Sequence, residues 1–338
     1  MKTYTLTLIA GLLCSSAFAQ KNIIKQKMME SDEQVESKLI NEENNTSLGD
    51  YASFIRTHAW NSRVSAFSIL KNTKELDIPI IGGRVRSSLV DKINDIALTA
   101  PSGGGLWKFN TDGSSFSPIN DLGEFLAITN INQNPFNKKQ IIIGTGDSQH
   151  GITGNGVFVS SDAGNTFTQI ISTNPINNSA FQYISFVKYS PQTQNTIYLV
   201  SRTKLYKSTN AGTSWTEVFD AGYNDIRSLE FTASTGVMIA VEKKGVYTSA
   251  NGNLNSFALK TSGIISEADV DNIVVSSHDA NRNIAYALKE KNKVGRVFKT
   301  INGGSSWTEL ATPDFYLSQG WFCLTLGVHP VSYTHLRA

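Results

Sequence analysis

Five stretches of this sequence share one pattern, and that pattern decides the fold. Each has an apolar start, a polar turn, an aromatic residue and a short β-prone end: LWKFNTDGSSFSPI at 106–119, VFVSSDAGNTFTQI at 157–170, LYKSTNAGTSWTEV at 205–218, VYTSANGNLNSFAL at 246–259 and VFKTINGGSSWTEL at 297–310. The aromatic residue recurs after 51, 48, 42 and 50 residues. Periods of this length indicate a repeat architecture.

Two further runs of β-branched and aromatic residues precede each stretch, bounded by turn residues. Upstream of the third stretch, for example, they are Tyr183–Tyr189 and Thr196–Ser201. Each unit therefore contains four short strands, which is typical of a propeller blade. We predict an all-β protein, a β-propeller with five four-stranded blades and the first strand of a sixth at Trp321–Pro330.

The turns resemble Asp-box repeats, whose pattern is Ser-x-Asp-x-Gly-x-Thr followed by Trp or Phe. Ser160–Phe167 matches in full, the third and fifth copies have Asn for Asp, the first is one residue shorter and the fourth is degenerate. In such a turn the Asp or Asn accepts backbone hydrogen bonds, the Gly allows a positive φ, and the aromatic ring packs between sheets. We predict structural roles for Asp112, Phe116, Asp162, Gly164, Phe167, Asn210, Gly212, Trp215, Asn251, Phe257, Asn302, Gly304 and Trp307.

Over residues 80–330 the chain resembles secreted Asp-box (BNR) propellers of the sortilin-like and sialidase-like superfamily. It is most similar to Bacteroidetes exported proteins that carry a C-terminal type IX sorting domain, through Gly82-Gly83-Arg84, Gly103–Trp107 and Gly320-Trp321. The resemblance implies secretion or a cell-surface location. It also implies the type IX secretion machinery as a partner, through a C-terminal domain that this sequence lacks.

The two ends of the chain differ from the repeat region. Lys2, the apolar run Thr5–Leu13 and Ala17-Phe18-Ala19 predict a signal peptide at 1–19, cleaved after Ala19. Residues 20–79 are a polar segment and linker, and 80–330 form the propeller. Residues 331–338 resemble translated sequencing-adapter sequence, so we expect a non-native tail on a C-terminally truncated chain.

Composition narrows the function classes. Among 338 residues, 30 are basic and 28 acidic, and the net charge of +2 provides no footprint for nucleic acid. Of two cysteines, Cys14 lies in the signal peptide, so the mature chain has no internal disulfide. The run at the N-terminus is too short to span a membrane, and we do not expect an integral membrane protein. Five histidines without paired spacing predict no metal site, and we expect no cofactor.

Three functions remain open, because a fold does not by itself define an activity. The first is a non-catalytic binding or adhesion propeller for an extracellular glycan or surface protein. The second is a glycoside hydrolase, xyloglucanase-like or, less well supported, a sialidase. The third is a sortilin-like protein or peptide binder.

No catalytic pair of carboxylates can be singled out from the sequence. Ligand binding is expected where long loops lie on a rigid scaffold. The longest loop of this kind is 144–156, with Asp147 and His150, and later blades add Tyr223, Asp225 and Glu242. The alternative is that this loop is an insertion at the rim of the blades.

Overall fold

The computed structural model describes residues 85–91, 94–101, 104–110, 116–119, 127–264, 270–311, 315–316, 320, 324–328 and 336–337. The chain divides between Pro79 and Ile80, and every described residue belongs to the second part. The predicted signal peptide, the segment 20–79, Asp112 and most of the tail 331–338 therefore lie outside the described residues.

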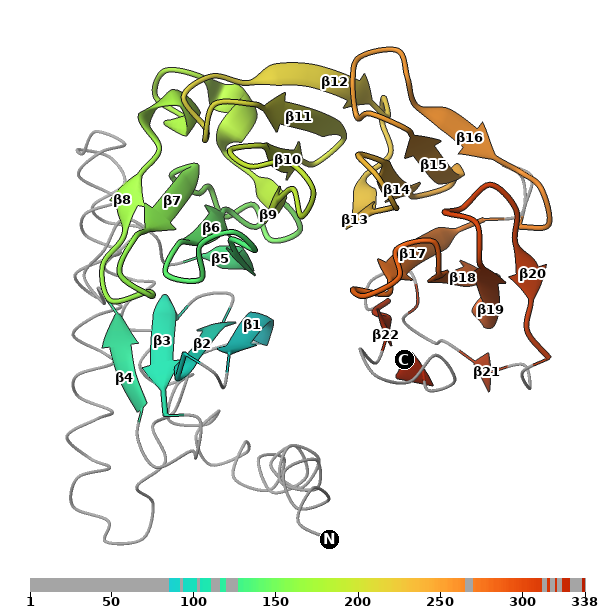
Figure 1. The fold of residues 1–338 in the computed structure, drawn as a ribbon, viewed down its shortest axis with the longest axis horizontal. Coiled ribbons are helices and arrows are strands. Elements are labelled where there is room, and N and C mark those ends of the chain that lie inside the picture. Colours follow the sequence, from blue (N-terminus) through green and yellow to red (C-terminus); the bar gives the residue numbers. More distant parts are fainter. Residues whose placement is uncertain are drawn as a thin grey trace, which may run out of the picture. The chain divides into compact units, whose positions relative to one another are not determined.

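Five antiparallel sheets follow one another along the chain, and in each the strands pair in sequence order (Figure 1). The first sheet comprises β1 (Val85–Asp91), β2 (Ile96–Pro101), β3 (Leu106–Phe109) and β4 (Phe116–Ile119). The second comprises β5 (Ile128–Gln133), β6 (Ile141–Thr145), β7 (Val157–Ser160) and β8 (Thr168–Gln169). The third comprises β9 (Ile184–Tyr189), β10 (Ile197–Ser201), β11 (Lys204–Ser208) and β12 (Thr216–Asp220).

The fourth sheet comprises β13 (Ile226–Phe231), β14 (Val237–Val241), β15 (Gly245–Ser249) and β16 (Ala258–Lys260). The fifth comprises β17 (Asn272–Ser277), β18 (Ala285–Lys291), β19 (Val294–Thr300) and β20 (Thr308–Glu309), and short β21 (Phe315–Tyr316) also pairs with β19. Two 3-10 turns, η1 (Ile171–Thr173) and η2 (Ser179–Phe181), connect the second and third sheets. The predicted all-β fold of four-stranded propeller blades is confirmed, and each sheet is called a blade below.

The second strand of a blade is buried on both faces, because each face packs against a different neighbouring blade. In β6, Ile141 and Ile143 belong to the apolar cluster shared with blade 1, whereas Ile142 belongs to the cluster shared with blade 3. In the same way, Leu199 of β10 faces blade 2 and Val200 faces blade 4. The alternation of side chains along a strand therefore explains why these strands are continuous apolar runs.

The predicted first strand of a sixth blade is described only at residues 324–328. Leu324, Leu326 and Val328 pack against the apolar face of blade 5, an alternation with the period of a strand. Within this stretch Gly327–Val328 forms β22, which pairs with β23 (Leu336–Arg337). The described part of the predicted sixth-blade strand therefore contributes its apolar side chains to the core of blade 5.

The first strand of each blade has a free edge, and side chains of the preceding blade satisfy part of it. Unpaired strand edges expose backbone N–H and C=O groups. Side-chain oxygens of one first strand accept hydrogen bonds from backbone amides of a neighbouring blade's first strand: Ser87 from Ile131 (3.0 Å), Asn130 from Val187 (3.0 Å), Asn132 from Tyr189 (2.9 Å) and Ser228 from Val275 (2.9 Å).

A β-bulge occurs at the second position of the first strand in blades 1 to 4. The bulged residues are Arg86, Thr129, Ser185 and Arg227. Bulges of this kind redirect a side chain relative to a regular strand. Two of the four carry a guanidinium group at the end of the blade where the candidate site lies.

Candidate functional site

Antiparallel topology separates two kinds of loop at opposite ends of each blade. The turns between third and fourth strands, which carry the Asp boxes, form the Asp-box end. The loops between second and third strands, together with the links between blades, form the loop end. All five predicted ligand residues belong to the loop end: Asp147 and His150 between β6 and β7, Tyr223 and Asp225 between β12 and β13, and Glu242 between β14 and β15.

Asp147 is buried beneath the surface of its loop and is held by charge from another blade. Its carboxylate is only 2% exposed and forms ion pairs with Arg86 Nη2 at 2.7 Å and with His150 Nδ1 at 2.8 Å. The backbone amide of Gln149 donates to the same carboxylate at 3.0 Å. Burial raises the pKa of Asp147, but the hydrogen bond with His150 and the charge of Arg86 outweigh it, so the pKa lies below its ordinary value.

The loop that carries Asp147 is tightly packed against the link to blade 3. Gly154 N donates to the carbonyl oxygen of Gln182 at 2.8 Å. A Cβ on Gly146, whose φ is +98°, would lie 2.1 Å from that same oxygen, and a Cβ on Gly156 would lie 2.1 Å from the carbonyl oxygen of Thr173. The loop is therefore an ordered part of the contact between blades 2 and 3.

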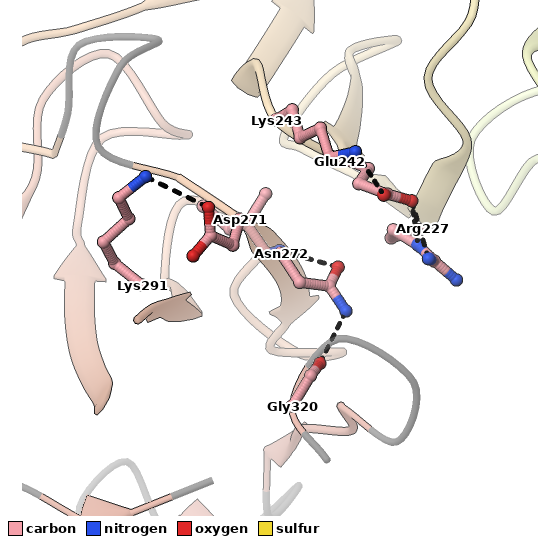
Figure 2. A network of polar contacts seen from close by, with 8 residues as sticks. Arg227, Glu242, Lys243, Asp271, Asn272, Lys291 and Gly320 are labelled. Atoms are coloured by element: carbon pink, nitrogen blue, oxygen red, sulfur yellow. Dashed lines mark hydrogen bonds and ion pairs between the residues drawn. The ribbon is translucent and has the colours of Figure 1, made fainter. Parts of the chain in front are cut away.

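Asp225 and Glu242 are joined by a backbone hydrogen bond in blade 4. The amide of Glu242 donates to the carbonyl oxygen of Asp225 at 3.0 Å. The Glu242 carboxylate accepts from Arg227 Nη2 at 2.6 Å and Nε at 3.0 Å, and Lys243 Nζ lies 3.7 Å away (Figure 2).

Blade 5 continues the row of paired charges, as Figure 2 shows. Lys291 Nζ lies 3.0 Å from Asp271, and the backbone amide of Asn292 and this ammonium group lower the pKa of Asp271. The buried Asn272 donates to the carbonyl oxygen of Gly320 at 2.8 Å. The loop end of blades 4 and 5 thus presents carboxylates that already have a cation beside them.

The fifth predicted ligand residue, Tyr223, is fully exposed and lines a cavity of about 490 Å³ on blade 3. Three segments form the cavity, namely η2 with the residues that follow it, the hairpin between β10 and β11, and the link to blade 4. Its lining comprises Ser179, Ala180, Gln182, Tyr183, Ser201, Arg202, Thr203, Lys204, Tyr206, Gly222 and Tyr223.

Two cations line this cavity in different states. Lys204 Nζ lies 2.8 Å from Glu217 and 3.3 Å from Asp220, so two carboxylates face its single charge, and the hydrogen bond with Glu217 raises the Lys204 pKa. Arg202 is exposed in the hairpin, with a φ of +53°. Its carbonyl oxygen accepts from Ile226 N at 3.0 Å, which holds the backbone in place.

Sequence reasoning did not select Arg202 or Tyr183. The segment 202–204 is only a short connection in the sequence, and Tyr183 precedes a strand, so neither has a motif around it. The sequence signal that could have pointed to Arg202 is its position as a basic residue at the tip of the hairpin between the second and third strands. The cavity itself becomes visible only when segments from three parts of the chain come together.

At the opposite end, the Asp-box turns repeat one set of contacts. Asp162 accepts from the amides of Asn165 at 3.1 Å and Thr166 at 2.9 Å, and from the Thr166 hydroxyl at 2.7 Å. The hydrogen bonds from the Thr166 amide and hydroxyl lower the pKa of Asp162 to about 2. Ser160 Oγ accepts from Gly164 N at 2.8 Å, which closes the turn.

In blades 3 and 5 an Asn amide replaces the carboxylate with the same geometry. Asn210 accepts from Ser214 N, and Asn302 accepts from Ser306 N, each at 2.9 Å. In the degenerate blade-4 turn, Asn251 accepts from Asn253 N at 3.0 Å. These side chains all serve the turn in which they lie.

The closing aromatic side chains lie against the clusters between blades. Trp307 is buried in the cluster shared by blades 4 and 5, and Trp215 packs on the cluster of blades 2 and 3. Phe257 packs between blades 3 and 4, and Phe167 between blades 1 and 2. Of Phe116, only the backbone is described, where it begins β4.

Two general searches of the described residues bear on the class of site. No group of three or more His, Cys, Asp or Glu side chains in the described part of the chain is arranged to hold a metal ion. None of the helices described there has the length and apolar character needed to cross a membrane.

The fold and site define this chain as an all-β repeat protein built from propeller blades. No family model matches it, and no curated protein sequence matches it. Among solved structures it is similar to an ancestral GH74 enzyme, with a TM-score of 0.55 and 20% identity over 69% of this chain and 32% of that one.

A second similar structure is the extracellular domain of a protein described as a hybrid two-component system from B. thetaiotaomicron. The TM-score is 0.51 at 18% identity, over 71% of this chain and 29% of that one. The chain thus spans about a third of the length of these structures. At this identity the likeness shows the propeller fold.

Proposed function

We propose that this protein is a non-catalytic binding propeller that holds an extracellular glycan at its loop end. The observation that carries the proposal is the blade-3 cavity, which is lined by tyrosines and hydrogen-bonding groups and contains no Asp or Glu. A concave site with aromatic walls and a few placed polar groups is the usual form of a small-molecule site. A cavity without carboxylates suits binding better than hydrolysis.

The charges around the cavity support the same choice. A glycosidase needs two available carboxylates, about 5 to 9.5 Å apart. Three carboxylates at the described loop ends, those of Asp147, Glu242 and Asp271, are ion-paired with Arg86, Arg227 and Lys291 respectively, whereas Asp225 and the buried Glu290 are not in these pairs. The guanidinium groups of Arg86 and Arg227 are occupied by the same pairs, which also weakens a sialidase-like arginine clamp.

Export to the cell surface is part of this proposal. It rests on the predicted signal peptide, with Ala17-Phe18-Ala19 before the cleavage point, and on the resemblance to exported Asp-box propellers. The type IX secretion machinery is the partner we propose for export. N-terminal sequencing of protein collected from the medium should begin at Gln20, and a chain that still carries Lys2 would contradict it.

The experiment for glycan binding compares two exposed aromatic residues. The purified protein is run through gels that contain soluble polysaccharides, and its retardation is measured together with the release of reducing ends. We expect retardation by at least one polysaccharide without release of reducing ends, and loss of retardation in Tyr223→Ala. Phe136→Ala is the matched control, because Phe136 is half exposed but lies between first and second strands, away from the loop end.

Two results would replace the proposal. Release of reducing ends would make the protein a glycoside hydrolase, the function that the GH74 likeness brings to mind. Retention of an extracellular protein, with no retardation by any polysaccharide, would favour the sortilin-like binder of proteins or peptides.

A further inference from the structure

The two cations that line the blade-3 cavity differ in their surroundings. None of the lining residues is acidic, and two are basic. Lys204 lies 2.8 Å from Glu217 and 3.3 Å from Asp220, so two carboxylates face its single positive charge. The guanidinium of Arg202 has no hydrogen bond or ion pair within residues 127–264, where the whole cavity lies. The Arg202 guanidinium is therefore the cation that can pair with a ligand, although the four side chains Lys204, Arg202, Glu217 and Asp220 together carry no net charge.

The apolar surface of the cavity comes from tyrosine rings. Ala180 is the only aliphatic side chain that lines it. Tyr206 packs on Phe181 in the core, with ring centroids 5.1 Å apart, and Tyr183 and Tyr223 are the other two aromatic residues that line the cavity. Tyrosine combines an apolar face with a polar tip. A sugar ring has C–H faces and many hydroxyls, which match the ring face and the hydroxyl group of tyrosine.

We infer that this cavity recognises a saccharide that carries a carboxylate, a uronic acid, with Arg202 as the group that binds the acid. The inference rests on the proposed glycan binding and adds the class of glycan. A guanidinium binds a carboxylate through two parallel hydrogen bonds, a geometry that a lysine ammonium cannot reproduce. Tyr223, in the link to blade 4, is the exposed aromatic ring of the lining, and in this inference it stacks on the sugar ring.

The position of Arg202 is set by the sheet and not by a flexible loop. Ser201 and Lys204 are paired across the hairpin, and the Arg202 carbonyl accepts from Ile226 N at 3.0 Å. The guanidinium is thus displayed from a fixed backbone point, which reduces the entropy lost when a ligand binds.

The test uses trigalacturonate and trimannuronate, each with its carboxyl-reduced counterpart, in calorimetric titrations of the whole protein. The reduced trimers keep the linkages and lack only the acid group. We expect at least one acidic trimer to bind about 10-fold or more tightly than its reduced counterpart, as expected for a charge-assisted hydrogen-bonded pair. Because this site is exposed, the preference should shrink as NaCl is raised.

The variants are Arg202→Gln, Arg202→Lys and Lys293→Gln. Arg202→Gln should remove the preference for the acid, and Arg202→Lys should restore only part of it. Lys293 is the matched control, since it is an exposed cation with a positive φ of 68° in the corresponding hairpin of blade 5. Lys293→Gln should leave both affinities unchanged, and circular dichroism checks that all three variants fold.

Each possible result bears on the inference. Equal binding of acidic and reduced trimers would overturn the uronate assignment and leave glycan binding in place. An unchanged acid preference in Arg202→Gln would also overturn it, because another group would then hold the acid. If no trimer binds while an acidic peptide does, both the inference and the proposed function fail.

Discussion

The two ends of the blades follow different rules. At the Asp-box end, blades 2, 3 and 5 repeat one arrangement, in which Asp162, Asn210 and Asn302 accept from the amides of their own turns. At the loop end each blade differs: blade 2 has an ion pair to blade 1, blade 3 has a cavity, and blade 4 has its own Arg227–Glu242 pair. Repetition thus marks the part that builds the fold, and variation marks the part available for function.

The Asp-box glycines show why repetition at that end is needed. A Cβ on Gly164 would lie 2.9 Å from Leu98, on Gly212 3.0 Å from Ile170, and on Gly304 2.8 Å from Met238. Each contact is with the preceding blade. The turn therefore closes a hairpin and also lets successive blades approach, and both demands recur in blades 2, 3 and 5.

The largest expected effect is at the Asp-box end, in Trp307→Ala. Trp307 is only 4% exposed between blades 4 and 5, so its loss should lower the free energy of unfolding by about 3–5 kcal/mol. Trp215→Ala should cost roughly 2–3 kcal/mol, because that ring is partly exposed. Urea unfolding measures both. Glycan binding per folded molecule should not change, and a loss of binding in a stably folded Trp307→Ala would contradict the division between the two ends.

The second prediction concerns the ion pair between blades 1 and 2. Arg86→Met leaves the buried Asp147 carboxylate without its guanidinium, and removal of one partner from a buried pair costs about 3 kcal/mol. Arg296→Met is the control, because its pair with Glu309 is about half exposed on both sides and should be worth roughly 0–1 kcal/mol. Equal losses in thermal and urea unfolding would show that the Asp147 pair behaves as a surface pair.

The third prediction distinguishes two costs of replacing a glycine in the loop 144–156, namely steric overlap of the new Cβ with other atoms and strain from a left-handed backbone. Gly146 and Gly151 both have a positive φ, of +98° and +67°, but only Gly146 meets other atoms where a Cβ would lie. Gly151→Ala should cost about 1 kcal/mol for the left-handed backbone. Gly146→Ala must also displace the Gln182 carbonyl and should cost about 2–3 kcal/mol. Similar stabilities for the two variants would show that the loop lies free of blade 3.

The smallest effect concerns the one carboxylate among these three Asp-box turns. The pKa of Asp162 is about 2 in the folded protein and about 3.9 in an unfolded chain. Its contribution is therefore complete above pH about 4 and is lost as the pH falls towards 2. Asp162→Asn, which copies blades 3 and 5, should remove roughly 1 kcal/mol of this pH dependence after allowance for solvent screening.

The measurement is the free energy of unfolding of both proteins at pH 5 and pH 2.5. Asp162→Ala provides the second reference, because it removes the acceptor altogether and should cost about 0.5–2 kcal/mol at pH 7. A wild-type protein with the same pH dependence as Asp162→Asn would show that folding does not lower the pKa of Asp162.

The fold could be predicted well because its signals are local and repeated. The contacts of an Asp box lie within a span such as Ser160–Phe167, and the alternation in β6 and β10 needs only neighbouring residues. The candidate site could be predicted only in part. Tyr223 lies at the cavity that we propose as the site, whereas Asp147 lies beneath its loop, paired with Arg86 from another blade. The assignment of ligand residues remains a prediction.

By itself the sequence determined the repeat period of the blades, the four strands of each blade and the turns that join them. The physical reason is that the hydrogen bonds of a turn and the alternation of side chains along a strand depend on residues that are close together in the sequence. Only the tertiary structure decided which charges are occupied and which face a cavity. The sequence around Arg86 and Arg202 does not reveal the different surroundings of the two arginines. In the structure, Arg86 forms an ion pair with the buried carboxylate of Asp147 from the next blade, whereas Arg202 is exposed and lines the cavity together with Tyr223. The physical reason is that burial and pairing depend on atoms brought from distant parts of the chain.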